Sequence, residues 1–245
     1  MTDMNSPGNR PTVVLVHGAF ADAGSWTNVT ERLQSADVPV KAIVNPLRGL
    51  AADAAYVASA IAQIPGPVLA VGHSYGGAVI TNAVTRNPNV DGLVYVAAFA
   101  PDEGESVGDR VGASQDSLLL PAVIEAKYPT GRDSEPESEF YIDPQKFREV
   151  FTADLPKEQS DALAASQRPA AAATLSEKTK SPAWKNLPSW AVVATADKAA
   201  GADNVRFMAQ RAGADITELN GSHVIMISQP DAATDVILKA YNTLN

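Results

Sequence analysis

One serine in the sequence has the surroundings of an activated nucleophile. Ser74 lies within residues 72–77 (GHSYGG), where an apolar run that we predict to be a strand meets a predicted helix. A turn this tight needs small residues near the serine, and the glycines two positions before and two positions after it meet that demand. The pattern therefore predicts a hydroxyl that is exposed at the carboxyl end of a sheet and can attack an electrophilic carbon.

A serine hydroxyl also needs a base that takes its proton, and the chain offers three histidines. His223 lies between the last predicted strand and the last predicted helix, in a loop that can place its side chain next to the serine. His73 is adjacent to the serine in sequence, so its side chain should point away into the packing between strand and helix. His17 is expected to form hydrogen bonds that shape the loop after the first strand. We therefore predict that His223 is the general base.

The base needs an acid that fixes its tautomer and stabilises its charged form. Asp197 follows a strand predicted at residues 190–195, again at a carboxyl end. Between Asp197 and His223 there is room for one helix and one strand, so the two loops should be neighbours. The order Ser, Asp, His along the chain is the one expected for a nucleophile on a strand-turn-helix motif. These features predict Asp197 as the acid.

Three other aspartates compete for the same role. Asp102 is the most serious alternative because it follows the strand predicted at residues 93–97, and a loop there could also approach the histidine. Asp203 has the position of a residue that starts a helix, and Asp215 lies within a predicted strand. Asp197 is therefore favoured over all three.

Attack on a carbonyl creates a negative oxygen that needs donors already in place. The backbone N–H of Tyr75, the residue after the serine, is one candidate. The N–H of Ala19, in the loop after the first strand, is the second candidate, with Phe20 as its alternative. We predict that Ala19 and Tyr75 form this oxyanion hole.

The elements that must position these residues alternate between strands and helices. Strands are predicted at residues 12–16, 38–44, 67–71, 93–97, 190–195 and 215–219, and helices at residues 50–64, 75–86, 204–212 and 230–241. A further helix, capped by Ser25, should bury Trp26, Val29 and Leu33. The alternation predicts an α/β fold, with helices on both faces of a mostly parallel sheet.

The alternation is interrupted at residues 101–185. This stretch combines prolines with acidic residues, and we predict only short helical pieces in it, such as residues 117–127 and 157–165. We interpret it as a cap inserted within a single domain of residues 1–245, because an α/β fold of this length is ordinarily one domain.

Composition narrows the possible partners. The absence of cysteine excludes disulfides, thiol catalysis and cysteine-ligated zinc, and a net charge of −9 disfavours nucleic acid and anionic membranes. Residues 1–10 are polar and contain no apolar run of the kind found in a signal peptide, and the apolar runs elsewhere are too short to span a bilayer. We therefore expect a cytoplasmic protein without a nucleic-acid or membrane partner, a cofactor or a metal.

The chain resembles compact bacterial α/β-hydrolases of the esterase type, which are related to plant methylesterases and hydroxynitrile lyases. The matching segments are residues 14–20 (VLVHGAF), 71–79 (VGHSYGGAV), 94–102 (VYVAAFAPD), 194–198 (ATADK) and 221–223 (GSH). The resemblance implies the α/β-hydrolase fold, a cap over the active site, Asp197 as the acid and an oxyanion hole of Ala19 and Tyr75.

The chain departs from these relatives at two places. After Asp197 many relatives carry a bulky residue and prolines, whereas this chain has KAAGA at residues 198–202, which puts the shape of the acid's loop in doubt. The plant hydroxynitrile lyases have a lysine after the histidine, where this chain has Val224. The second departure weakens a lyase function.

These features predict a serine hydrolase that cleaves small, uncharged, largely apolar carboxylic esters through an acyl-enzyme. Phe20, Trp184 and Val224 are predicted to line its substrate pocket. Two alternatives stay open. One is a lyase that acts on cyanohydrins with the same three residues, and the other is a non-catalytic receptor for a small ligand on the same scaffold.

Overall fold

The computed structural model describes residues 10–131 and 134–244. Residues 1–9 and residues 132–133 lie outside the described residues. The first range holds most of the polar segment for which no signal peptide is predicted, and the second belongs to the predicted cap. In the part of the chain that is described, no helix is long and apolar enough to cross a membrane.

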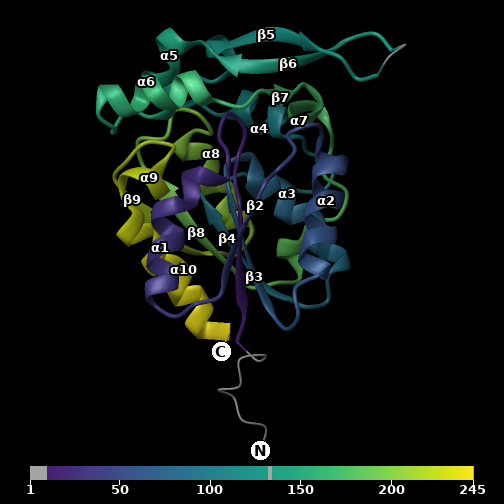
Figure 1. The fold of residues 1–245 in the computed structure, drawn as a ribbon, viewed down its shortest axis with the longest axis vertical. Helices are drawn as coiled ribbons and strands as arrows, with labels where there is room; N and C mark the ends of the chain where they lie inside the picture. Colours follow the sequence, from purple (N-terminus) through teal and green to yellow (C-terminus); the bar gives the residue numbers. More distant parts are fainter. Residues whose placement is uncertain (1–9, 132–133, 245) are drawn as a thin grey trace, which may run out of the picture.

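A six-stranded sheet forms the centre of the molecule (Figure 1). In spatial order its strands are β2 (Val40–Ile43), β1 (Thr12–Val16), β3 (Val68–His73), β4 (Val90–Val96), β8 (Ser189–Ala194) and β9 (Asp215–Leu219). Every neighbouring pair is parallel, so all six strands end at the same edge. Every residue of β3 and β8 is buried, as expected for inner strands that are covered on both faces.

Helices cover both faces of this sheet, which confirms the predicted α/β architecture. Figure 1 shows α1 (Thr27–Ser35) and α10 (Pro230–Leu244) together on one side, and α2 (Leu50–Ala62) and α3 (Tyr75–Ala83) together on the other. Other helical elements that lie outside residues 101–185 are η2 (Val84–Arg86), α8 (Ala202–Arg211) and α9 (Ile225–Ser228).

The predicted helix cap at Ser25 is wrong. The side chain of Asp22 accepts the N–H of Gly24 at 2.7 Å and so caps the 3-10 turn η1 (Ala23–Trp26), which leads into α1. A carboxylate in this position satisfies a donor that the turn leaves free. The side chains predicted to face the core are all buried: Trp26, Val29 and Leu33.

The chain between β4 and β8 contains what we call the cap (residues 101–185), and its middle part, residues 123–171, lies across the carboxyl edge of the sheet (Figure 1). Its elements are α4 (Val107–Ala113), η3 (Leu120–Ala122), β5 (Val123–Tyr128), β6 (Glu137–Ile142), α5 (Pro144–Phe151), α6 (Lys157–Ser166), β7 (Ala170–Ala171), α7 (Ala173–Ser176) and η4 (Ala183–Lys185). Strands β5, β6 and β7 form a small antiparallel sheet.

One of the two helical pieces predicted in the cap is wrong. Residues 157–165 do form a helix, α6. Residues 117–127 instead contain η3 and most of β5, because Pro121 interrupts a helix and the following backbone pairs with β6. A local apolar pattern does not distinguish these outcomes, since the partner strand decides between them.

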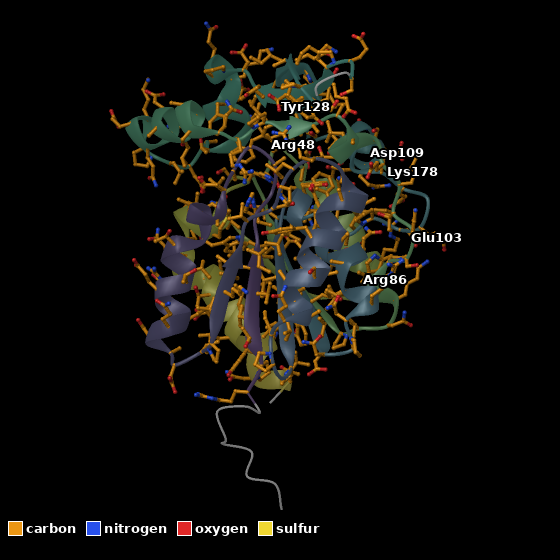
Figure 2. All side chains as sticks on the ribbon, turned by 45° about the vertical axis from the view of Figure 1, so that its right-hand side comes forward. Arg48, Arg86, Glu103, Asp109, Tyr128 and Lys178 are labelled. Atoms are coloured by element: carbon orange, nitrogen blue, oxygen red, sulfur yellow. The ribbon has the colours of Figure 1, made fainter. Side chains whose placement is uncertain are left out.

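Two arginine side chains form contacts between the cap and the core. The guanidinium of Arg48, which precedes α2, pairs with Glu139 of β6 at 2.7 Å and lies 4.3 Å from the ring centre of Tyr128 in β5 (Figure 2). Arg168, which precedes β7, donates to the backbone oxygen of Asn45 at 3.1 Å. These contacts hold the cap over the loops at the carboxyl edge of the sheet.

Candidate active site

The parallel sheet brings the predicted residues together because each follows the carboxyl end of a strand. Ser74 follows β3, Asp197 lies three residues after β8, and His223 lies four residues after β9. Ala19 lies in the loop after β1, which neighbours β3. Four loops that are far apart in sequence thus meet at one edge of the sheet.

The backbone at Ser74 is strained, as a sharp strand-to-helix turn requires. Its φ and ψ angles are 53° and −126°, a conformation that residues with side chains rarely adopt. The glycines around it are required by contact: a Cβ atom on Gly72 would lie 2.6 Å from the carbonyl oxygen of Gly76, and one on Gly76 would lie 2.3 Å from the oxygen of Val16. The turn therefore has no room for larger residues at these positions.

The prediction that the Ser74 hydroxyl is exposed is wrong. Ser74 is only 6% exposed, because residues of the cap and of neighbouring loops close over it. It faces a small cavity, which we call the Ser74 cavity, with about 300 Å³ of empty space. Its lining is mostly apolar and comprises Ala19, Phe20, Ser74, Tyr75, Phe99, Val107, Leu119, Phe151, Leu175, Ala199, Ala200 and His223. A reaction at Ser74 would take place away from bulk water.

Asp197 and His223 form a buried pair. Nδ1 of His223 lies 2.8 Å from Oδ2 of Asp197, and both side chains are almost completely excluded from solvent. The other carboxylate oxygen, Oδ1, accepts the backbone N–H groups of Ala199 and Ala200 at 2.8 and 3.0 Å. Because a carboxylate only accepts, the proton of a neutral His223 lies on Nδ1, and Nε2 carries a free lone pair.

Ser74 and His223 face the same cavity without a hydrogen bond between them. Nε2 of His223 is buried and has no hydrogen-bond partner among the described residues. Such contacts are often long in structures without substrate and shorten when it binds. The arrangement offers a basic nitrogen and a hydroxyl to one small space.

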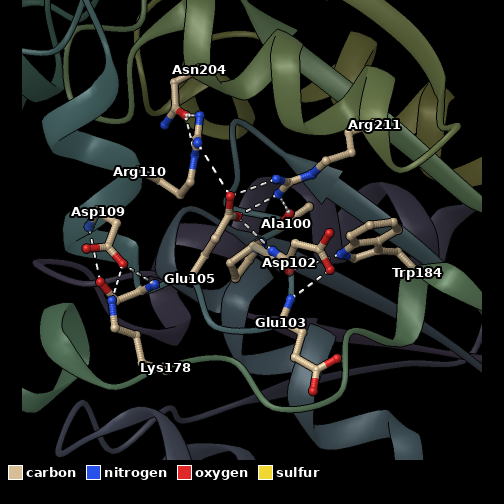
Figure 3. Close-up of polar contacts among 12 residues, drawn as sticks. Ala100, Asp102, Glu103, Glu105, Asp109, Arg110, Lys178, Trp184, Asn204 and Arg211 are labelled. Atoms are coloured by element: carbon tan, nitrogen blue, oxygen red, sulfur yellow. Dashed lines mark hydrogen bonds and ion pairs between the residues drawn. The ribbon is translucent and has the colours of Figure 1, made fainter.

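The competing aspartates lie elsewhere. Asp102 forms an ion pair with Lys185 at 2.6 Å near the surface, and this contact keeps its pKa below the ordinary value. Asp203 accepts from the Ser114 hydroxyl, and Asp215 pairs with Lys239. Figure 3 shows Asp102 within a network of cap and core residues around Glu105 and Arg211. Of these four aspartates, the structure brings only Asp197 to His223.

Ala19 and Tyr75, whose backbone N–H groups are the predicted donors, both line the Ser74 cavity. In the described part of the chain, neither donates to a backbone carbonyl. The Tyr75 hydroxyl donates to the buried carboxylate of Asp53 at 2.8 Å and so anchors the first turn of α3, and burial raises the pKa of Asp53. Phe20, the alternative donor, has a positive φ of 61°. That Ala19 and Tyr75 form an oxyanion hole stays a prediction.

His73 supports His223 from behind. Its Nε2 lies 3.0 Å from the backbone oxygen of His223, and the two ring centres are 4.7 Å apart. A carbonyl only accepts, so Nε2 of His73 carries the proton. Burial keeps the pKa of His73 well below the ordinary value, which leaves its ring neutral. The sequence predicted only packing for His73, because this hydrogen bond has no signature in the local sequence.

His17 organises the loop after β1. Its Nδ1 donates to the oxygen of Gly18 at 2.9 Å, and its Nε2 accepts the N–H of Asn45 at 2.9 Å. Burial lowers its pKa from 6.5 to about 4. These bonds fit the expected role in shaping the loop that holds Ala19.

The structure has a serine on a strained turn and a buried Asp-His pair, both beneath a cap on a parallel sheet. A comparison of the whole sequence with protein families agrees with this arrangement. Residues 13–236 match the family described as "Alpha/beta hydrolase family". This chain belongs to the alpha/beta hydrolase family. The resemblance and the fold class inferred from the sequence are thereby confirmed.

Individual alpha/beta hydrolases show how far the similarity extends. A carbendazim-hydrolysing esterase from Nocardioides sp. (strain SG-4G) is 32% identical over an alignment of 107 residues, and this alignment covers 38% of this chain and 44% of that esterase. This matched stretch is less than half the length of that curated relative. The similarity in sequence is therefore partial.

The similarity in structure covers almost the whole chain. Polyneuridine aldehyde esterase matches with a TM-score of 0.79 at 21% identity, over 95% of this chain and 99% of that one. The methylesterase MES16 from Arabidopsis matches with a TM-score of 0.77 at 20% identity, over 96% of this chain and 100% of that one. At these identities the likeness shows the fold.

In this alpha/beta hydrolase the predicted pocket residues separate into two groups. Phe20 lines the Ser74 cavity, and Val224 lines a second cavity beside it. Trp184 lines neither, because its Nε1 donates to the oxygen of Pro101 at 3.1 Å and its ring packs beside Arg211 (Figure 3). The prediction that Trp184 lines the pocket is therefore wrong.

Two aromatic residues of the cap lie close to His223, although their place in the sequence did not predict it. Phe151, at the end of α5, lies over the ring of His223 with 4.9 Å between ring centres, and Phe147 packs against Phe151 at 5.1 Å. Their spacing of four residues on one helix marks a buried face. The spacing indicates that face but not the loop that it covers.

Proposed function

We propose that this alpha/beta hydrolase is a carboxylesterase that hydrolyses small, uncharged, largely apolar esters through an acyl-enzyme. The observation that carries the proposal is the free Nε2 of His223, which borders the same buried cavity as Ser74 while Nδ1 is held by Asp197. This is the arrangement in which a histidine can activate a serine.

The reaction follows from the positions of these groups. Nε2 of His223 takes the proton from Oγ of Ser74 as Oγ bonds to the ester carbonyl carbon, and the N–H groups of Ala19 and Tyr75 stabilise the oxygen that becomes negative. Asp197 stabilises the imidazolium. His223 then gives the proton to the leaving alcohol, which leaves the acyl group on Ser74. Water, activated by the same nitrogen, releases the acid and restores the serine.

The charge distribution favours this function over cleavage of cyanohydrins. A lyase of that kind needs a cation that stabilises departing cyanide. The residue after His223 is the buried Val224, and Lys198, which follows Asp197, lies 3.8 Å from Glu149 of the cap. Neither residue is among those that line the Ser74 cavity. An apolar cavity suits a neutral ester.

The relatives are consistent with this assignment. A partial relative and two structural neighbours are named as esterases or methylesterases. A non-catalytic receptor would not need the strained turn at Ser74 together with the paired Asp197 and His223, since strain of this kind is kept where it serves function.

A panel of substrates tests the proposal. We expect the purified protein to hydrolyse nitrophenyl and methyl esters of short, uncharged acids, and to release no cyanide from mandelonitrile above the enzyme-free rate. Ser74→Ala, which removes only the hydroxyl, should abolish ester turnover and leave the thermal unfolding midpoint unchanged. Rapid cyanide release without ester hydrolysis would show that the chemistry has been assigned to the wrong class.

A further inference from the structure

A second cavity lies beside the Ser74 cavity, between the cap and the core. We call it the outer cavity, and it holds about 690 Å³ of empty space. Helices α5 and α6 of the cap form one side, while the loop after β1 and the residues after His223 form the other. Its apolar lining is Phe20, Phe147, Phe151, Leu163, Val224 and Ile227. It is the larger of the two cavities, with about 690 Å³ of empty space against about 300 Å³ in the Ser74 cavity.

Two phenylalanine side chains separate the cavities. Phe20 and Phe151 are the residues that line both, and their rings meet edge to face with 6.3 Å between centres. The boundary is thus made of side chains from two different segments. An ester that occupies both spaces requires these two side chains to move apart, which a change of rotamer can provide.

The position of the outer cavity relative to His223 indicates which part of an ester it receives. The leaving oxygen of an ester must come within reach of Nε2 of His223, so the alcohol part extends to the histidine side of the carbonyl. Val224, directly after His223, and Ile227 line the outer cavity. The Ser74 cavity is closed instead by Ala199 and Ala200, beside Asp197, and by cap residues.

We propose that the outer cavity binds the alcohol part of the ester, and that this part is a large, uncharged, apolar group of about the size of a benzyl or naphthylmethyl group. The acyl part is small and stays in the Ser74 cavity. This inference rests on the proposed esterase function. The charged residue of the outer lining is Asp22, whose carboxylate repels anionic alcohols.

Two series of esters test the inference. The first keeps an acetyl group and varies the alcohol from methyl through butyl and benzyl to 2-naphthylmethyl, and the second keeps methanol and lengthens the acid. Leu163 of α6 borders the outer cavity, so Leu163→Trp fills it, and Leu163→Ala enlarges it. Ala162→Trp is the matched control, because Ala162 is exposed on the same helix.

We expect kcat/KM of the native protein to rise with the size of the alcohol and to fall with the length of the acid. Leu163→Trp should lower kcat/KM for the benzyl and naphthylmethyl acetates by about tenfold or more and leave methyl acetate unchanged. Leu163→Ala should not lower it for the large alcohols, and Ala162→Trp should change neither series. An effect of Leu163→Trp on the acid series instead, or on both series equally, would overturn the inference.

A binding measurement separates this inference from the esterase function. Free 2-naphthalenemethanol should bind to the native protein and to Ser74→Ala, and binding should be lost in Leu163→Trp. If no ester were hydrolysed while this pattern of binding held, the esterase function would be refuted and the cavity would stand. Hydrolysis of short methyl esters without any such binding would refute the cavity and leave the esterase function intact.

Discussion

Replacement of Asp197 by asparagine should move the proton of His223 from Nδ1 to Nε2 without disturbing the fold. Oδ1 of Asp197 accepts the N–H groups of Ala199 and Ala200 at 2.8 and 3.0 Å, so it has to remain an oxygen. In Asp197→Asn the amide NH₂ would then occupy the position of Oδ2, 2.8 Å from Nδ1 of His223. An NH₂ group donates, so Nδ1 would become the acceptor and the proton would move to Nε2.

A proton on Nε2 removes the lone pair that must accept the proton of Ser74. The loss in kcat expected for a reversed tautomer is about 10⁴-fold, which corresponds to about 5.5 kcal/mol of transition-state stabilisation. KM should change little, since Asp197 is not among the residues that line the Ser74 cavity. The two backbone hydrogen bonds to Oδ1 survive in the variant, so its thermal unfolding midpoint should stay close to that of the native protein.

The assay is the steady-state hydrolysis of a short nitrophenyl ester by the native protein, Asp197→Asn and Asp102→Asn. Asp102 pairs with Lys185 near the surface, so its variant should keep the native kcat. If kcat of Asp197→Asn fell by less than about tenfold, the predicted change of tautomer would be refuted, because His223 with its proton on Nε2 cannot act as base. A larger loss in Asp102→Asn would show that the acid follows β4.

Three further predictions concern the residues that hold the site. His73→Leu leaves the buried backbone oxygen of His223 without its donor, so the free energy of unfolding, measured by urea denaturation, should fall by about 1–3 kcal/mol. In the same variant kcat should fall by a larger factor than KM changes. Gly76→Ala places a Cβ atom 2.3 Å from a carbonyl oxygen and should prevent folding, as seen by circular dichroism, whereas Gly112→Ala has no atom within 4 Å and should keep the native midpoint. Burial lowers the pKa of His17 from 6.5 to about 4, so its neutral form stabilises the fold fully above pH 6.5. The free energy of unfolding should therefore decrease as the pH falls from 6.5 towards 4, and this decrease should be smaller in His17→Gln.

The core of the fold was accessible from the sequence because its elements carry their own pattern. The predicted strand at residues 215–219 coincides with β9, and the strand predicted at 190–195 is shifted from β8 by one residue at each end. Parallel strands also determine where loops meet, which is why Ser74, Asp197 and His223 could be placed together without a structure. Their roles in the reaction remain predictions.

The cap was much less predictable, because its elements depend on distant partners. Residues 123–128 become a strand only through pairing with β6, and Phe151 reaches His223 only because α5 is folded back over the sheet. The burial of Ser74 depends on the same placement. Trp184 was assigned to the pocket for its aromatic character alone, although its indole N–H is committed to Pro101.

The identity of the residue that forms the covalent intermediate is the most direct test of the account. The native protein would be treated with a fluorophosphonate, digested, and mapped by mass spectrometry, with Ser74→Ala and Asp102→Asn treated in parallel. We predict one adduct, on Ser74, in the native protein and in Asp102→Asn, slowed by a short ester substrate and absent from Ser74→Ala. An adduct on another residue, or undiminished labelling of Ser74→Ala, would contradict the assignment of Ser74 as the nucleophile.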